Sequence, residues 1–426
     1  MTDRASKPLD VGSGAVCASF DAETAAWLSL GSPHADHGFV ELSAVPRFDE
    51  AERGDPGATR RHRERLTDGR FAFLAVHGHP TLTPDCVDPQ MPHWRAPGCT
   101  VDVATGVDAE IVTQRWSVDR EVRLSLQGRL DRPALAEITE IDPPPLTGAK
   151  TRITVAGAVA QLDAPELPAQ ARVEVPGGAW RATEAGAELL IGPGSFEIRA
   201  SLGGVARAGT PPPPTTDPDP LVARALAYVR GCTALRTAPD ERTILTDHRL
   251  LPLSWTRDAY YQALLLLAAD APGDRERVAD HLRWLWRRCE RPDGRWARSH
   301  HANGRRKDLA FQADQQLYPI VELTDYWRLT GALPGGVDWT AAVAAAWEAA
   351  MGAVDPATGL VASAETAADD PAEAPFIAAP QILLWYTARR LDELDAAGAL
   401  RASWAAGRAA AVRAAFDAHL RHAGRW

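Results

Sequence analysis

The sequence predicts an α+β protein of two domains: an antiparallel β-sandwich over residues 1–205 and an all-α domain over residues 221–426. Three observations lead to this prediction. Hydrophobic residues alternate with period two in the first half, they recur with helical spacing in the second half, and a proline-rich segment separates the halves. We expect that segment, residues 206–220, to be a linker, because proline fixes φ and cannot donate a backbone hydrogen bond.

The first half contains short strand-like runs separated by turn residues. Residues 122–126 (VRLSL) alternate between apolar and polar side chains, and Phe196 and Ile198 repeat that pattern. Clusters of proline and glycine at 176–178 and 192–194 bound such runs. This arrangement is typical of an antiparallel sandwich, in which each sheet has one buried face.

The second half contains segments with the apolar spacing of helices. Val278, Leu282 and Leu285, for example, share one helical face. The segment 376–386 is apolar on nearly all sides, which predicts a helix surrounded by protein, and its alternation with charged helices predicts two concentric layers. The seven predicted helices span about 221–235, 254–270, 274–290, 312–330, 338–351, 376–394 and 399–421. The long loops between them, 291–311 and 352–375, are expected to carry function.

Composition excludes several classes of function. The chain has 426 residues, of which 45% are hydrophobic and 24% are charged, as in soluble globular proteins. A net charge of −10 argues against a nucleic-acid partner, which requires a concentrated basic surface. The one basic run, residues 60–65, is interpreted as a solvated loop. The cysteines contain no C-x-x-C pair and are predicted to be reduced thiols: Cys17, Cys86, Cys99, Cys232 and Cys289.

The sequence also bears on location and on metals. The first twenty residues lack a continuous apolar stretch, and the longest apolar run, 263–269, is too short to cross a bilayer. We therefore predict a cytoplasmic protein with no membrane partner. Pairs of nearby histidines lack a third ligand at a recognisable spacing, so no metal site and no cofactor are expected.

The most informative segment is LPLSWTRDAYYQALLLLA, residues 251–268, in which Arg257 and Asp258 precede an apolar run. A carboxylate in the first turn of a helix is stabilised by about 0.3–1 kcal/mol through the helix dipole. A guanidinium fork and a carboxylate together match the paired hydroxyls of a sugar. The alternative involves no ligand: Ser254 would cap the helix, Asp258 would complement its dipole, and Arg257 would be a surface residue.

A sandwich followed by a helical domain that opens on Trp255-x-Arg257-Asp258 resembles the six-hairpin (α/α)6 glycosidases, in particular the glucoamylase-like group of glycoside hydrolase families 15, 63 and 125. The segment FQADQQLYP, residues 311–319, resembles the D-Q-x-x-Y segment of that group. The loop 359–381 lies where glucoamylase-like enzymes carry their general acid. The resemblance implies an exo-acting, inverting glycoside hydrolase that removes terminal α-linked glucose or mannose and needs no cofactor.

The site residues expected on these grounds combine hydrogen-bonding groups with flat indole surfaces. The residues expected to bind substrate are Trp255, Arg257, Asp258, Trp296, Asp314 and Gln315. Glu365 is the candidate general acid, although its neighbours depart from the family's paired acidic motif, and Asp369 and Asp370 are further candidates in the same loop. Tryptophans at helical spacing, Trp286, Trp347 and Trp404, are interpreted as core residues.

The general base is the gap in this assignment. Inversion requires two carboxyl groups about 6.5–9.5 Å apart, and no residue matches the position of the family's base. Seven helices do not close a twelve-helix ring, so we expect a partial toroid that a missing C-terminal segment or self-association would complete. A glycoside phosphorylase and a non-catalytic carbohydrate-binding relative remain as alternatives, and an oligosaccharide or glycoside is the expected partner in each.

Overall fold

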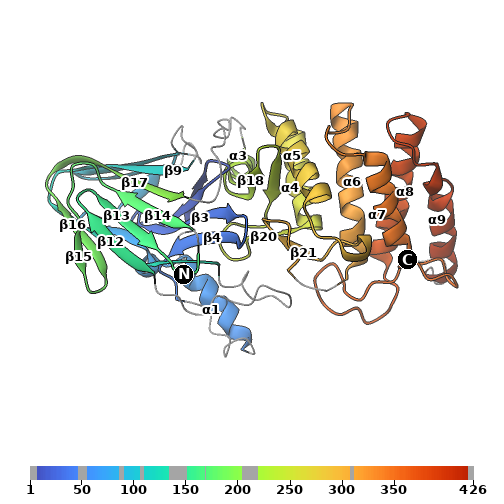
Figure 1. Ribbon diagram of the computed structural model, residues 1–426, viewed down its shortest axis with the longest axis horizontal. Helices are drawn as coiled ribbons and strands as arrows, with labels where there is room; N and C mark the ends of the chain where they lie inside the picture. The colour runs from blue at the N-terminus through green and yellow to red at the C-terminus, as the bar shows by residue number, and fades with distance from the viewer. Residues whose placement is uncertain are drawn as a thin grey trace. The chain divides into compact units, whose positions relative to one another are not determined.

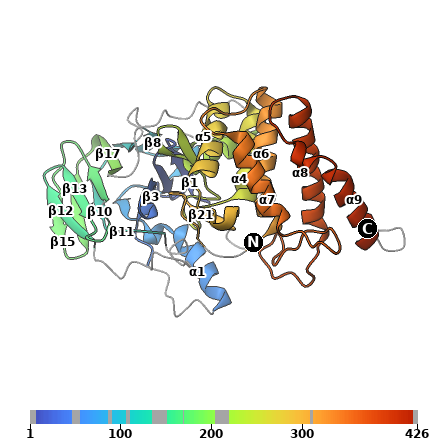
Figure 2. The same cartoon turned by 45° about the vertical axis from the view of Figure 1, so that its right-hand side comes forward.

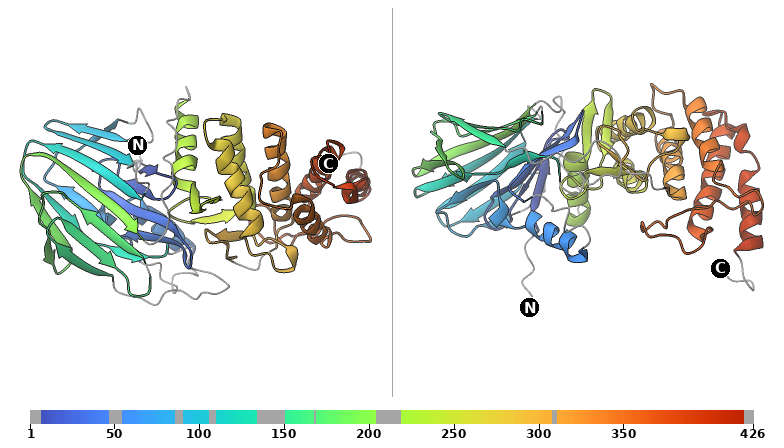
Figure 3. Two further views of the ribbon diagram at one scale, coloured as in Figure 1. Left: turned by 45° about the horizontal axis from the view of Figure 1, so that its top comes forward. Right: turned by 60° about the horizontal axis from the view of Figure 1, so that its bottom comes forward.

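The computed structural model describes residues 7–46, 55–85, 91–105, 110–133, 151–167, 169–203, 219–307 and 311–420. The chain forms two compact units. Of the described residues, unit 1 contains those up to Pro239 together with Leu245–Pro252, and unit 2 contains Asp240–Ile244 and those from Leu253 onward. Strands fill the first unit and helices the second (Figures 1 and 3), which confirms the predicted α+β arrangement.

Unit 1 is built on two antiparallel sheets. Within the described residues the first has nine strands, in the order β1-β2-β3-β5-β10-β16-β15, with β4 paired to β3 and β11 paired to β4. These strands are β1 Leu9–Gly12, β2 Cys17–Phe20, β3 Trp27–His34, β4 Gly38–Ser43, β5 Leu74–His77, β10 Val122–Leu126, β11 Arg129–Asp131, β15 Arg181–Thr183 and β16 Gly186–Ile191.

The second sheet, counted over the same part of the chain, has eight strands in the order β12-β13-β14-β17-β9-β8-β7-β6. They are β6 Thr83–Asp85, β7 His93–Ala96, β8 Cys99–Thr105, β9 Ile111–Val118, β12 Arg152–Ala156, β13 Val159–Asp163, β14 Gln170–Glu174 and β17 Gly194–Gly203. In both sheets neighbouring strands run antiparallel, as the alternating sequence pattern predicts.

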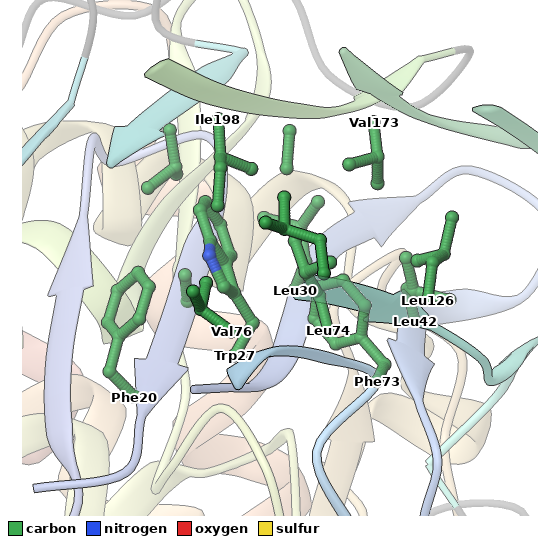
Figure 4. Close-up of a cluster of buried hydrophobic side chains, with 14 of the residues drawn as sticks. Phe20, Trp27, Leu30, Leu42, Phe73, Leu74, Val76, Leu126, Val173 and Ile198 are labelled. Carbon is green, nitrogen blue, oxygen red and sulfur yellow. The ribbon is translucent and has the colours of Figure 1, made fainter. Parts of the chain in front are cut away.

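The hydrophobic core of unit 1 lies between the two sheets (Figure 4). Trp27 and Leu126 come from the first sheet, Val173 and Ile198 come from the second, and all four are at most 1% exposed. Burial of one such side chain contributes about 1.5–3 kcal/mol. The alternation over β10 is confirmed, because its apolar residues are buried while Arg123 is exposed.

The basic run at 60–65 is not a loop, so that prediction is wrong. It lies on helix α1, Pro56–Leu66, which begins at Asp55. The Asp55 carboxylate accepts a hydrogen bond of 2.8 Å from the backbone N–H of Gly57 and so caps the helix. Arginines cover most of the helix surface, and the sequence therefore lacks the apolar stripe from which a helix is recognised.

The remainder of unit 1 follows the segment predicted as a linker, most of which, 206–218, lies outside the described residues. Helix α3, Pro220–Tyr228, begins at Asp219 and continues into one π-turn, Val229–Thr233, before strand β18, Ala234–Ala238. These elements belong to unit 1, so the boundary between the units lies after Pro239 and not at the proline-rich segment.

Unit 2 contains the other six predicted helices in chain order (Figures 1 and 2). They are α4 Thr256–Ala269, α5 Asp274–Arg287, α6 Ala313–Thr330, α7 Trp339–Met351, α8 Ala378–Ala396 and α9 Arg408–His419, and the unit also has the short strands β19 Glu241–Ile244, β20 Leu253–Trp255 and β21 Ser299–His301. Helix α6 packs against both α4 and α8, α5 packs against α4 and α6, α7 packs against α6, and α9 packs against α8. The two concentric layers stay a prediction.

Helix α8 is less enclosed than its sequence predicts. Ile382 is 55% exposed, because one side of the helix borders an open groove of about 370 Å³ between α8 and α9. The groove is lined by Ala378, Gln381, Ile382, Trp385, Val412, Arg413 and Phe416.

Two further expectations concern cysteines and membranes. Four cysteines are buried free thiols, Cys17, Cys99, Cys232 and Cys289, while Cys86 lies outside the described residues. In the part of the chain that the structure describes, no helix combines the length and the apolar character needed to span a bilayer.

Candidate functional site

The candidate site lies at the junction between strand β20 and helix α4. Strand β20 pairs with β21, and Trp255 at its end occupies the N-cap position of α4 without a side-chain capping bond. Ser254 lies inside β20 and is 2% exposed, so it does not cap the helix. The Arg257 side chain is only 16% exposed. The alternative in which Ser254 caps and Arg257 is a surface residue is therefore wrong.

Arg257 lies among three carboxylates. Its Nη1 is 3.0 Å from Oδ2 of Asp314, its Nη2 is 3.6 Å from Oδ1 of Asp369, and its Nε is 3.8 Å from Oδ2 of Asp258. A planar guanidinium can hold several acceptors at fixed angles, which an ammonium cannot do. Residues from α4, from α6 and from the loop 359–375 thus meet at one cation.

Asp258 is one of two carboxylates of this group that are open to a ligand, the other being Asp369. The Asp258 side chain is 40% exposed. Burial raises the pKa of Asp258 above the ordinary value, Asp369 and Asp314 add to that increase, and Arg257 opposes it. The protonated form of Asp258 is thus favoured more than that of a free aspartate, and a protonated carboxyl group can donate as well as accept a hydrogen bond.

Helix α6 contributes Asp314 from its first turn, but Gln315 has a different role from the one predicted. Gln315 is fully buried, and its Oε1 accepts hydrogen bonds from the hydroxyl of Thr256 and from the backbone N–H of Arg257, the latter at 3.0 Å. The side chain therefore joins the first turn of α4 to α6 and leaves no polar atom for a substrate. In this structure Gln315 holds the starts of α4 and α6 together and is not exposed to the site.

The loop 359–375 brings Glu365 to the same place. The Glu365 Oε2 is 3.1 Å from Nη1 of Arg298 and accepts a hydrogen bond of 3.0 Å from Nε2 of Gln312. Both partners donate, so the carboxylate is an acceptor here, and proton donation to a leaving group requires that one of these contacts be exchanged. Asp370 is exposed, and its backbone carbonyl accepts a hydrogen bond from the N–H of Thr366.

Glu365 and Asp369 are too close together to form an inverting pair. Nε2 of Gln312 donates to both of them, at 3.0 Å to Glu365 and at 2.6 Å to Asp369. The two bonded oxygens are therefore nearer to each other than the roughly 6.5–9.5 Å that leaves room for an attacking water. Asp369 therefore does not serve as the base for an inverting reaction in which Glu365 is the acid.

The two tryptophans predicted as sugar platforms lie in different surroundings. Trp296 is 2% exposed, its ring packs edge-on against Trp286 at 4.9 Å, and Arg291 lies 4.8 Å from its centroid. Trp296 is thus a core residue here and not a wall of the site. Trp255 is half-buried at the start of α4. Of the tryptophans interpreted as core, Trp286 and Trp347 are buried, whereas Trp404 is 39% exposed.

Two tyrosines supply the aromatic surface that the tryptophans do not. Tyr261 follows Asp258 by one helical turn on α4, and Tyr318 follows Asp314 by one turn on α6. Tyr261 is 56% exposed, the two ring centroids are 6.0 Å apart, and the two hydroxyl oxygens are 3.4 Å apart. The sequence contained one signal for these two tyrosines: each follows an acidic residue of the predicted site by one helical turn.

Gln312 and Arg298 also touch the acidic residues and were not predicted. Gln312 belongs to the segment 311–319 that carries the resemblance, but its partners are more than fifty residues away along the chain. Arg298 lies in the loop after α5, where one arginine among several has no distinguishing signal. Among the described residues, no cluster of three or more His, Cys, Asp or Glu side chains is arranged to hold a metal ion.

The arrangement was compared with known proteins. No family model and no curated protein sequence matches the chain. A bacterial glucoamylase complexed with acarbose aligns over 96% of this chain and 66% of its own, at 10% identity with a TM-score of 0.56. A putative kojibiose phosphorylase from the human microbiome aligns over 96% and 65%, at 7% identity with a TM-score of 0.49.

A Streptococcus pneumoniae protein from a family of metal-independent α-mannosidases, in complex with α-1,6-mannobiose, aligns over 46% of this chain and 56% of its own, at 15% identity with a TM-score of 0.34. The likeness to the glucoamylase has the highest TM-score of these three, and this chain spans about two thirds of the length of that enzyme. The chain thus shares its fold with this bacterial glucoamylase, in line with the resemblance stated for the segments at 255–258 and 311–319.

Proposed function

We propose that the protein is a glycoside hydrolase that binds the terminal sugar of an α-linked glucoside or mannoside at the N-terminal ends of α4 and α6. The observation that carries this proposal is the convergence of Arg257 with Asp258, Asp314 and Asp369 beside exposed Tyr261. Carboxylates and a guanidinium fork suit vicinal hydroxyls, and a phenol ring suits the apolar face of a pyranose. The shared fold with a bacterial glucoamylase supports the same conclusion.

The roles follow from exposure and contact. Asp258 is the most exposed of the acids in contact with Arg257 on α4 and α6, so we assign it to the sugar hydroxyls, with Arg257 holding it in place. Glu365 is the proposed general acid, because it lies beside this group on a loop and not within a helix. The general base is unassigned, since Asp369 is too close to Glu365 to serve in an inverting reaction.

A second candidate function follows from that geometry. Glu365 accepts hydrogen bonds from two donors, Arg298 and Gln312. Asp369 lies too close to Glu365 for a sugar ring and an attacking water to fit between them. A protein that binds the sugar without cleaving it would need only the Arg257 group and the tyrosines. The second candidate is therefore a carbohydrate-binding relative without turnover.

The test uses the whole chain and a panel of α-linked glucosides and mannosides, with inorganic phosphate present or absent. Release of a terminal monosaccharide, with its anomeric configuration followed by NMR as it forms, is the expected result, and inversion would support the exo-acting inverting assignment. Turnover only with phosphate would identify a phosphorylase. Saturable binding by calorimetry without product would favour the second candidate, and the absence of both binding and turnover would contradict the proposal.

A further inference from the structure

Gln312 occupies a central position in the site. It is the N-cap residue of α6, is fully buried, and makes no capping bond to its own helix with its side chain. Its amide instead uses both of its donor hydrogens and its acceptor oxygen. Nε2 donates to Glu365 at 3.0 Å and to Asp369 at 2.6 Å, while Oε1 accepts from Arg257 at 3.4 Å and from Gln315 at 3.1 Å.

This hydrogen-bond pattern fixes the orientation of the amide group. Reversal would place the carbonyl oxygen against two carboxylates and the NH2 group against two other donors, which would lose every bond. One side chain thus connects both loop carboxylates to Arg257.

The charge balance explains why an uncharged residue suits this position. Asp258, Asp314, Glu365 and Asp369 carry four negative charges when ionised, and Arg257 and Arg298 provide two positive ones. A carboxylate at position 312 would repel both loop acids, and a cation would form an ion pair with them. An amide donates to both acids and leaves the net charge of the site unchanged.

We propose that Gln312 is a positioning residue that sets the distance and orientation of Glu365 and Asp369 relative to Arg257, and that activity depends on it although it does not touch the substrate. The inference rests on the proposed function for its kinetic readout. A misplacement of about 1 Å in a reacting group costs roughly 10²-fold in rate. The loss is expected in kcat more than in KM, because Asp258 remains available to the sugar.

The chain offers a matched control for loop anchoring. Gln381 is also fully buried, and its amide holds the same loop through backbone groups only, with the N–H and the C=O of Val361 at 2.8 Å and 2.7 Å. Gln381→Met therefore loosens one end of the loop without removing a bond to a carboxylate. Gln312→Met removes the bonds to the carboxylates and retains a similar volume.

The first measurement is backbone hydrogen exchange of the full-length protein over residues 361–375, which does not depend on knowing the substrate. We expect Gln312→Met to accelerate exchange most around 365–370, and Gln381→Met to do so around 361. The helix α6 amides should stay protected in Gln312→Met. Unchanged exchange at 365–370 would overturn the inference, whether or not the wild type turns over any glycoside.

The second measurement compares kcat and KM for the substrate that the wild type cleaves. We expect kcat to fall about 10²-fold in Gln312→Met, and by much less in Gln381→Met. In Gln312→Glu the new carboxyl group restores one donor when it is protonated, so the kcat of this variant relative to wild type should rise as the pH is lowered. Parallel pH profiles, or equal losses in both Met variants, would show that Gln312 is only structural. Failure of the wild type on every substrate would contradict the proposed function instead.

Discussion

Helix α7 begins differently from the two helices that form the site. At the start of α7 the Asp338 carboxylate accepts a hydrogen bond of 3.2 Å from the N–H of Ala341, so the acid satisfies its own helix. Helices α4 and α6 begin at Trp255 and Gln312, neither of which makes a side-chain capping bond. Their first-turn acids, Asp258 and Asp314, lie beside Arg257 instead.

The difference between these helix starts shows how a first-turn carboxylate can be available to a ligand without loss of helix capping. The N–H of Arg257 near the start of α4 is satisfied from outside the helix, by the side chain of Gln315 on α6. Because the neighbouring helix provides that capping, Asp258 does not have to provide it and can face a ligand. A substitution at the start of α4 should therefore change activity, whereas one at the start of α7 should change stability.

The largest expected effect is that of Arg257→Ala. Loss of the guanidinium leaves Asp258, Asp314 and Asp369 without their shared partner, and kcat/KM should fall by about 10²–10³-fold. Arg257→Lys keeps the charge but not the planar fork, so it should recover only part of that loss. Steady-state kinetics measures both variants, with circular dichroism as the control for folding. Turnover equal to wild type in Arg257→Ala would remove the site assignment.

The next effect compares two acids of one loop. Glu365→Gln should lower kcat by about 10²-fold if Glu365 donates a proton to the leaving group. Asp370→Asn makes the same chemical change five residues away, where the side chain is exposed, and should leave kcat near its wild-type value. Equal effects of the two substitutions would mean that the loop acids act through their general charge and not through one position.

A third prediction concerns an acid of α6 that lies away from the site. Glu322 is 1% exposed, and within the described residues neither of its carboxylate oxygens has a hydrogen-bond partner. Burial raises its pKa to about 8, and burial lowers the pKa of His281, on α5, to about 3. The distance of 3.8 Å from His281 Nε2 to Glu322 Oε2 thus joins two neutral groups and not an ion pair.

The sign of the pH dependence follows from proton counts. Between about pH 7 and pH 8 the unfolded chain, with ordinary values of 4.5 and 6.5, has lost most of both protons, whereas the folded protein keeps most of that of Glu322. The contribution of this pair to stability should therefore fall by up to about 1.4 kcal/mol per pH unit over that window. Glu322→Gln should remove this contribution to the decline, as urea unfolding of both proteins at pH 7 and pH 8 will show. An identical decline in the variant would mean that Glu322 is ionised in the folded state.

These particulars also show what the sequence could and could not predict. Helices α4 to α9 were predictable because each has enough apolar residues at helical spacing to mark it. Helix α1 was not, since of the three buried residues described in it, Ala58, His62 and Leu66, one is polar and one is small, which leaves too weak an apolar pattern. The approach of Arg257 to Asp258 and Asp314 followed from two local motifs, each at the start of a helix.

Contacts between distant segments were beyond the reach of these patterns. A tryptophan on a loop can lie against a sugar or against other side chains, and Trp296 packs on Trp286 because of how the loop folds back on α5. Gln312 bonds to Glu365 fifty-three residues later, so no local spacing indicates the pair. Hydrophobic periodicity determines which face of an element is buried, but not which polar groups meet at its end.

The smallest expected effect, Asp338→Ala, tests the other side of the comparison. The substitution removes the capping bond to Ala341 and should cost about 1 kcal/mol of stability. The midpoint of thermal unfolding should fall by about 2–4 °C if unit 2 unfolds as one cooperative unit of its size. Turnover at 25 °C should not change, because Asp338 contacts none of the residues around Arg257 in the described chain. Loss of activity without loss of stability would mean that the starts of α4 and α7 do not differ in role, and that the capping of α4 by Gln315 has no functional consequence.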